Sequence, residues 1–154
     1  MKMLCIRLFA LCAAFVLVLS ATGCGEKTAL SPEEFRERCE EIGFTVTEGD
    51  VGEDGTVIKL LAAKYSGYVL NYSLLPDAAT ARGVFDEIVA AYERGNNTFV
   101  MSLSTSFGDH SYRHFTSGNS FYLVSRIADT IIYCTADKAH KDSITETVEK
   151  LGYK

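Results

Sequence analysis

Two short patterns in the sequence contain side-chain types that could do chemistry. Asp109, His110 and Ser111 are the residue types of a serine-hydrolase triad. Because adjacent residues of a strand point to opposite sides of a sheet, these three cannot line up as orienting acid, base and nucleophile. His110 and His114 would share one face of a strand, but four residues span about 13 Å, too far for one metal ion. Neither pattern predicts a catalytic residue, a metal site or a cofactor.

Five cysteines are the other reactive side chains. Cys5 and Cys12 lie in an apolar N-terminal segment and Cys24 follows it, which leaves Cys39 and Cys134 in the rest of the chain. A nucleophilic thiol needs an activating histidine, and nothing in the sequence places one beside either residue. Two interpretations stay open. Cys39 and Cys134 form a disulfide in an oxidising compartment, or they are buried free thiols that pack as small apolar side chains.

The N-terminal segment has the organisation of a signal peptide. Lys2 and Arg7 form a basic head, and the residues from Leu8 to Leu19 carry no polar side chain. A membrane-spanning helix needs about 20 apolar residues, so this shorter run is typical of the apolar core of a signal peptide. Small uncharged residues then precede Cys24.

The run Ala21-Thr22-Gly23-Cys24 resembles a lipobox, the recognition site of the lipoprotein signal peptidase, although Ala21 stands where leucine is commoner. The resemblance implies cleavage between Gly23 and Cys24 and a diacylglyceryl group on the Cys24 thiol. Two or more acyl chains, such as palmitate, anchor a protein stably without a spanning helix. The alternative is an ordinary secretory signal peptide with a small-x-small cleavage site at Ala21 to Gly23.

These features divide the chain into a cleaved signal peptide (residues 1–23), a lipidated N-terminus with a short tether (24–30) and one globular domain (31–154). Loss of Lys2 and Arg7 with the signal peptide changes the formal net charge from −5 to −7. An acidic domain is repelled by nucleic acid and by anionic lipid headgroups. We therefore expect no nucleic-acid partner, and a location on the extracytoplasmic side of the cell membrane that depends on the anchor at Cys24.

Hydrophobic periodicity and capping residues predict the element order helix, strands, helix, strands, helix in the domain. Ser31, Pro32 and Glu34 form a capping box at the first helix. The second helix covers residues 78–94, and the third begins after Asp137. Alternating or β-branched segments predict strands at residues 44–47, 57–63, 68–75, 99–107, 112–116, 121–127 and 130–136. Short connections indicate an α+β fold, an antiparallel sheet of about six strands with helices packed on one face.

A two-residue turn at Ala128-Asp129 would fix the register of the last hairpin, with Leu123 opposite Cys134. The other face of this hairpin would then carry Tyr122, Arg126 and Tyr133. If helices cover only the opposite face, these three residues form an exposed aromatic and cationic patch suited to a partner protein or a glycan. Ordinary strand composition is the alternative interpretation, since tyrosine is common in strands.

From Ser31 onward the chain is similar to small Gram-positive lipoproteins of unknown function. The similarity lies in the element order, in Ser125-Arg126-Ile127 and in the closing Leu151-Gly152-Tyr153, and it implies no activity. We expect a non-catalytic binding or accessory module of the cell envelope, of which an enzyme inhibitor would be one form. The alternative is a cell-envelope hydrolase whose site is assembled from distant residues such as His114 and nearby carboxylates.

The anchor can be tested directly by the Cys24→Ser substitution. Without the thiol no diacylglyceryl group can be attached, so the variant should leave the membrane fraction or keep its uncleaved mass. Cell fractionation and intact-mass measurement check this expectation. A variant that stays membrane-bound with the processed mass of the parent would show that Cys24 is not the anchor.

Overall fold

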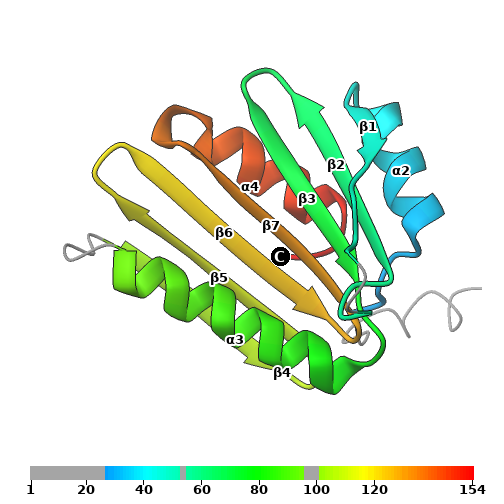
Figure 1. Ribbon diagram of the computed structural model, residues 1–154. Helices are drawn as coiled ribbons and strands as arrows, with labels where there is room; N and C mark the ends of the chain where they lie inside the picture. The colour runs from blue at the N-terminus through cyan, green and yellow to red at the C-terminus, as the bar shows by residue number, and fades with distance from the viewer. Residues whose placement is uncertain (1–26, 53–54, 96–100) are drawn as a thin grey trace, which may run out of the picture.

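The computed structural model describes residues 27–52, 55–95 and 101–154. Within these residues one antiparallel sheet of seven strands packs against three α-helices (Figure 1). The predicted α+β class and the predicted order of helices and strands are confirmed. Gly23 and Cys24, on which the anchor depends, lie outside the described residues, as does Phe99 at the predicted start of a strand.

The elements follow one another along the chain as α2 (Pro32–Glu41), β1 (Thr45–Glu48), β2 (Lys59–Tyr65), β3 (Tyr68–Leu74), α3 (Ala78–Gly95), β4 (Met101–Phe107), β5 (His110–Ser117), β6 (Ser120–Ile127), β7 (Thr130–Asp137), the 3-10 turn η1 (Lys138–His140) and α4 (Lys141–Lys150). The sheet has seven strands, where about six were predicted. The short β1 is a full member of it, because Thr45 to Glu48 pair along their whole length with Lys64 to Leu61 of β2.

The capping residues act as the sequence predicts. Ser31 Oγ accepts from the Glu34 amide at 3.2 Å, and the Glu34 carboxylate accepts from the Ser31 amide at 2.8 Å. The carboxylate of Asp77 accepts from the Thr80 amide at 2.7 Å and so caps α3. These contacts satisfy amides that the first turn of a helix leaves without partners. Local chemistry thus sets where these helices begin.

The strand order is β1-β2-β3-β7-β6-β5-β4. Each half of the sheet is a meander of consecutive strands, and the two halves join where β3 pairs with β7. The turn at Ala128 and Asp129 sets the predicted register of the last hairpin, with Leu123 opposite Cys134. That prediction is confirmed, and it places Leu123 and Cys134 on one face and Val124 on the other.

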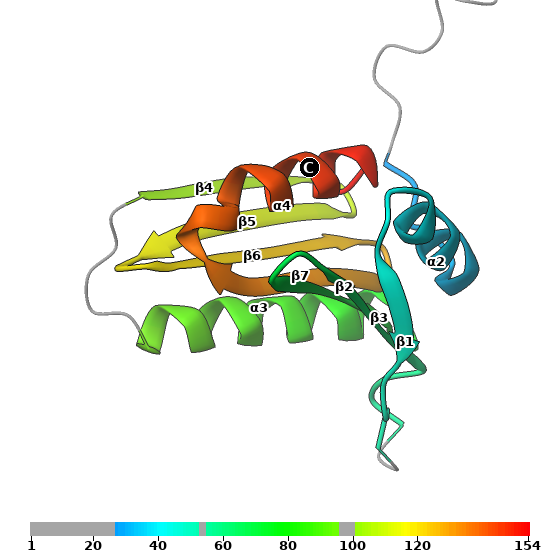
Figure 2. The same ribbon diagram turned by 90° about the horizontal axis from the view of Figure 1, so that it is seen from above.

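Helices cover both faces of the sheet, so the prediction that they pack on one face is wrong. Figure 2 shows α2 and α4 on one side of the sheet and α3 on the other. The larger core lies under α2 and α4. A second core forms where Phe85 and Val89 of α3 pack on Val124 and Ile131. The physical reason is that β6 and β7 carry apolar residues on both faces, the pattern of strands covered twice.

Tyr153 closes the larger core. Tyr153 is fully buried, and its hydroxyl accepts from the Leu30 amide at 3.2 Å and lies 2.6 Å from Thr130 Oγ1. Because the Thr130 hydroxyl donates to the Ile127 carbonyl, the Tyr153 hydroxyl is the donor to Thr130. The Tyr72 hydroxyl donates to the Leu30 carbonyl at 2.7 Å. Tyr153 therefore holds the start of the domain against its end, and Tyr72 holds it against β3.

The Tyr153→Phe substitution should lower the free energy of unfolding by about 1–3 kcal/mol, because it leaves the buried Leu30 amide without its partner. Urea unfolding at unchanged m-value measures the loss. Tyr65→Phe is the matched control, since Tyr65 is 40% exposed and should change stability by less than about 0.5 kcal/mol. Equal effects of the two substitutions would contradict a structural role for the Tyr153 hydroxyl.

Candidate binding groove

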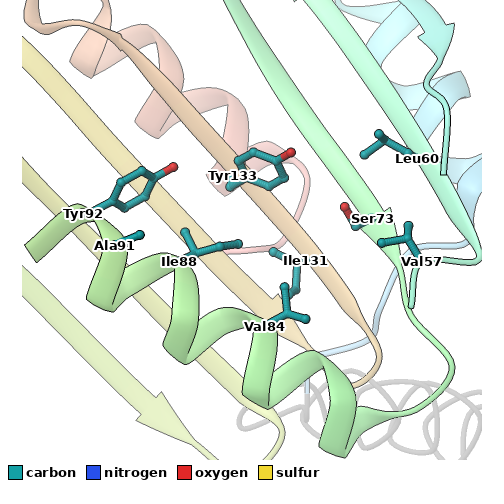
Figure 3. Close-up of a pocket in the computed structure, with 9 residues that line it drawn as sticks. All are labelled: Val57, Leu60, Ser73, Val84, Ile88, Ala91, Tyr92, Ile131 and Tyr133. Carbon is teal, nitrogen blue, oxygen red and sulfur yellow. The ribbon is translucent and has the colours of Figure 1, made fainter. Parts of the chain in front are cut away.

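An apolar groove with a volume of about 320 Å³ lies on the α3 face of the sheet, between α3 and strands β2, β3 and β7 (Figure 3). Uncharged side chains line it: Val57, Leu60, Ser73, Val84, Ile88, Ala91, Tyr92, Ile131 and Tyr133. Its size is at the lower end of small-molecule pockets, which occupy roughly 300–1,000 Å³. The groove therefore has room for a few apolar groups.

The groove exists because the apolar surface of α3 is wider than the surface it buries on the sheet. Phe85 and Val89 are each 8% exposed and point into the second core. Val84 and Ile88, four residues apart on the neighbouring stripe of the helix, are only half-buried and form one wall of the groove. α3 packs on β6 and β7 and makes no comparable contact with β2 and β3. The same face of β2 and β3 therefore forms the other side of the groove.

Hydroxyl groups are the polar features of the groove. Ser73 is 7% exposed and comes from β3, while Tyr133 comes from β7. Burial raises the pKa of Tyr133, so its phenol stays neutral near pH 7. Burial also raises the pKa of Tyr92, whose hydroxyl accepts from Thr135 Oγ1 at 3.2 Å. The site suits an uncharged, largely apolar group that can form one or two hydrogen bonds.

Tyr122, Arg126 and Tyr133 share the α3 face, as the register predicts, but they do not form one open patch. Tyr122 stacks on Phe115 at a ring distance of 5.3 Å and lies 4.8 Å from the ring of Tyr92. Tyr133 lines the groove. The expected patch is corrected to a groove with Tyr133 in its wall, because α3 covers the rest of this face.

Arg126 is buried on this face, so its charged guanidinium is not accessible to a partner. Its side chain is 1% exposed, and its guanidinium donates to the Ala128 carbonyl at 3.0 Å and to Ser111 Oγ at 3.4 Å. Burial lowers the pKa of Arg126, and the nearby Arg82 lowers it further. Arginine nevertheless remains charged at neutral pH. The residue therefore ties β6 to the neighbouring turn and to β5.

His114, the centre of the alternative enzyme hypothesis, lies on the opposite face of the sheet from the groove. Its Nδ1 is 2.8 Å from the Tyr112 hydroxyl, and its ring is 5.6 Å from that of Phe121. Burial lowers the pKa of His114, and the positive charges of Lys141 and Lys154 lower it further. His114 thus lies apart from the groove, and within the described residues no hydrogen bond or ion pair joins it to a carboxylate. Glu149 is nonetheless close to its surroundings, since it pairs with Lys154 at 2.7 Å and acts electrostatically on Tyr112.

His110, from the same strand, is also engaged in the larger core. Its Nε2 lies 3.3 Å from the Tyr153 carbonyl oxygen, and burial lowers the pKa of the imidazole. In the described part of the chain no group of three or more His, Cys, Asp or Glu side chains could hold a metal ion. His110 therefore acts in the packing of the C-terminus.

Cys39 and Cys134 are both buried and both free in the structure. Burial raises the pKa of each thiol to about 12. A thiol with such a pKa is protonated at neutral pH and is a poor nucleophile. Of the two interpretations that the sequence leaves open, the structure contains the pair of buried free thiols rather than the disulfide.

Most of the groove residues were not identified from the sequence. The signal that could have identified them is the run of apolar positions in α3, where Val84 and Ile88 form a second stripe beside Phe85 and Val89. A helix on a flat sheet buries one such stripe, so the second predicts either a partner or a groove. Leu60, Ser73 and Ile131 carry no comparable signal, because strand order alone brings them beside α3.

No protein-family model matches the chain, and no curated protein or solved structure matches it either. Across residues 27–52, 55–95 and 101–154, no helix is both long enough and apolar enough to cross a membrane.

Proposed function

We propose that the chain is a membrane-anchored lipoprotein that faces the extracytoplasmic side and serves as a non-catalytic binding module of the cell envelope. The lipobox-like run ending at Cys24 supports the anchor. The uncharged groove between α3 and the sheet supports the binding role, and it is the observation that carries the proposal. Its ligand is an apolar side chain, or a small cluster of them, on an envelope protein.

The start of the domain supports a defined orientation of this groove. Leu30 belongs to the core under α2 and α4, and Lys27 Nζ donates to the carbonyl oxygens of Gly152 and Lys154. The chain thus enters the domain on the α4 side, opposite α3 (Figure 2). Between Cys24 and Lys27 the chain can reach only about 11 Å at ~3.6 Å per residue. The groove is then turned away from the lipid and toward the envelope.

The lining of the groove distinguishes a protein ligand from a glycan. A sugar carries many hydroxyl groups, each of which needs a polar partner when it leaves water. The groove offers only the hydroxyls of Ser73, Tyr92 and Tyr133, and the hydroxyl of Tyr92 already accepts from Thr135. Apolar side chains require no such partners, and anchoring residues of this kind dominate many protein interfaces. A partner protein therefore fits the groove better than a glycan.

Photo-crosslinking from inside the groove tests this function. A photoreactive phenylalanine analogue at the position of Ala91, which lines the groove, should yield a discrete protein adduct in intact cells. The same analogue at the position of Ala79, an exposed residue at the start of α3 outside the groove, is the control and should yield at least tenfold less adduct.

A second substitution makes the test specific. Ile88→Asp places a charge in the apolar wall and should abolish the adduct formed from position 91. Equal adducts from positions 79 and 91, or an adduct that survives Ile88→Asp, would contradict binding in the groove. An adduct that a glycosidase degrades would identify a glycan in place of a protein, and an adduct to lipid would contradict the orientation.

A further inference from the structure

The two edges of the sheet are built differently. β1 is the edge strand on one side, and it is only four residues long. The Arg36 guanidinium donates to the Val46 carbonyl oxygen at 3.0 Å, and Glu48 of this strand forms an ion pair with Lys59 at 2.7 Å. Short length, charged side chains and a covering group are the usual protections of an edge strand. The β1 edge is therefore closed to another strand.

Within residues 27–52, 55–95 and 101–154, the opposite edge, β4, lacks these protections. It is seven residues long and contains neither a charged residue nor a proline. Among the described elements, β5 is the one with which β4 makes extensive contact. The side chains of Ser104, Thr105 and Ser106 are exposed, and Phe107 is 84% exposed. An open strand edge presents a regular row of amide and carbonyl groups, which otherwise bond to water and which another extended backbone can pair with in register.

We propose that β4 pairs with β4 of a second copy of this chain, antiparallel and about a two-fold axis at Ser104, to form one sheet across the two copies. A two-fold interface requires a strand that is complementary to itself. With Ser104 opposite itself, Phe107 comes opposite Met101, and Thr105 opposite Leu103. No like charges meet in this register, although the chain as a whole carries a formal net charge of −5.

The composition of β4 favours a second copy over an unrelated segment. A charged edge strand would repel an identical strand and select a partner of opposite charge. β4 carries no charge, so two copies of it can pair without opposing like charges. Pairing between two copies would also cover part of Phe107, the most exposed of the large apolar side chains in the described chain. The inference does not depend on the groove or on the lipid anchor.

Cysteine crosslinking of the full chain in the producing cells tests both the pairing and its register. In Ser104→Cys the two new thiols would lie directly across the two-fold axis, where paired Cα atoms are about 4.5–5.5 Å apart and a disulfide can form. In Ser106→Cys they would be offset by four residues, about 13 Å, and could not be joined. Mild oxidation with copper phenanthroline should give at least tenfold more covalent dimer from Ser104→Cys than from Ser106→Cys.

Charge substitutions at the same position provide an independent readout. Ser104→Lys alone, or Ser104→Glu alone, would place like charges opposite each other in the paired copies. Each should therefore prevent photo-crosslinking of the two copies through a photoreactive phenylalanine analogue at the position of Phe107. That crosslinking reaction requires neither an amine nor a carboxylate, so the substitutions do not alter its chemistry. Coexpression of the two variants should restore it. Thr45→Lys, at the exposed start of the other edge strand β1, should have no effect.

The outcomes separate the alternatives. Absence of a covalent dimer from Ser104→Cys, or equal yields from Ser104→Cys and Ser106→Cys, would overturn the proposed pairing. A covalent adduct of Ser104→Cys to a protein of different mass would assign the edge to another partner and overturn the second-copy interpretation. Failure of the coexpressed Ser104→Lys and Ser104→Glu chains to associate would overturn the register centred on Ser104.

Discussion

The hydroxyl of Tyr153 is held between the Leu30 amide and the Thr130 side chain, inside the core that α2 and α4 cover. The backbone carbonyl of Tyr153 accepts a hydrogen bond from Ser125 Oγ at 2.5 Å, so Tyr153 also contacts β6. A buried polar group costs free energy unless it is paired, and each of these groups finds its partner on a different element. The pairing constrains the two ends of the domain to one face of the sheet.

That constraint separates the two faces of the molecule by role. The face under α2 and α4 contains the larger core, the half-buried His114 and the entry of the chain at Lys27. The other face is covered by α3 along β6 and β7 and remains grooved beside β2 and β3. The entry point and the groove lie on opposite sides. On the proposed anchoring at Cys24, a short tether would therefore turn the groove away from the membrane, and attachment and binding would use different surfaces.

Local signals in the sequence were sufficient for much of the fold. The capping box at Ser31 and Glu34 and the turn at Ala128-Asp129 depend on neighbouring residues, and both prove correct in the structure. The pairing of β3 with β7 joins residues about sixty positions apart and has no comparable local signal. That pairing decides which strands lie beside α3. The strands that complete the groove therefore could not be predicted from the sequence, although the second apolar stripe of α3 is visible in it.

In the candidate site, too, local sequence signals predict some features and long-range packing decides the others. Tyr133 was placed on the correct face by strand alternation alone. The burial of Arg126 and the stacking of Tyr122 on Phe115 follow from the coverage by α3, so these residues are less exposed than the hairpin alone predicts. Alternation along a strand identifies which residues share a face, while the helices packed on that face determine which of them a partner can reach.

The central claim is that the lipid-anchored domain presents its groove away from the membrane, and energy transfer to labelled lipid measures it most directly. A donor dye is attached through Ala91→Cys beside the groove or through Glu146→Cys on the exposed side of α4, with the processed chain inserted in vesicles that carry an acceptor lipid. The buried thiols of Cys39 and Cys134 should remain unlabelled. The account predicts stronger transfer from position 146 than from position 91. Equal transfer, or stronger transfer from position 91, would contradict it.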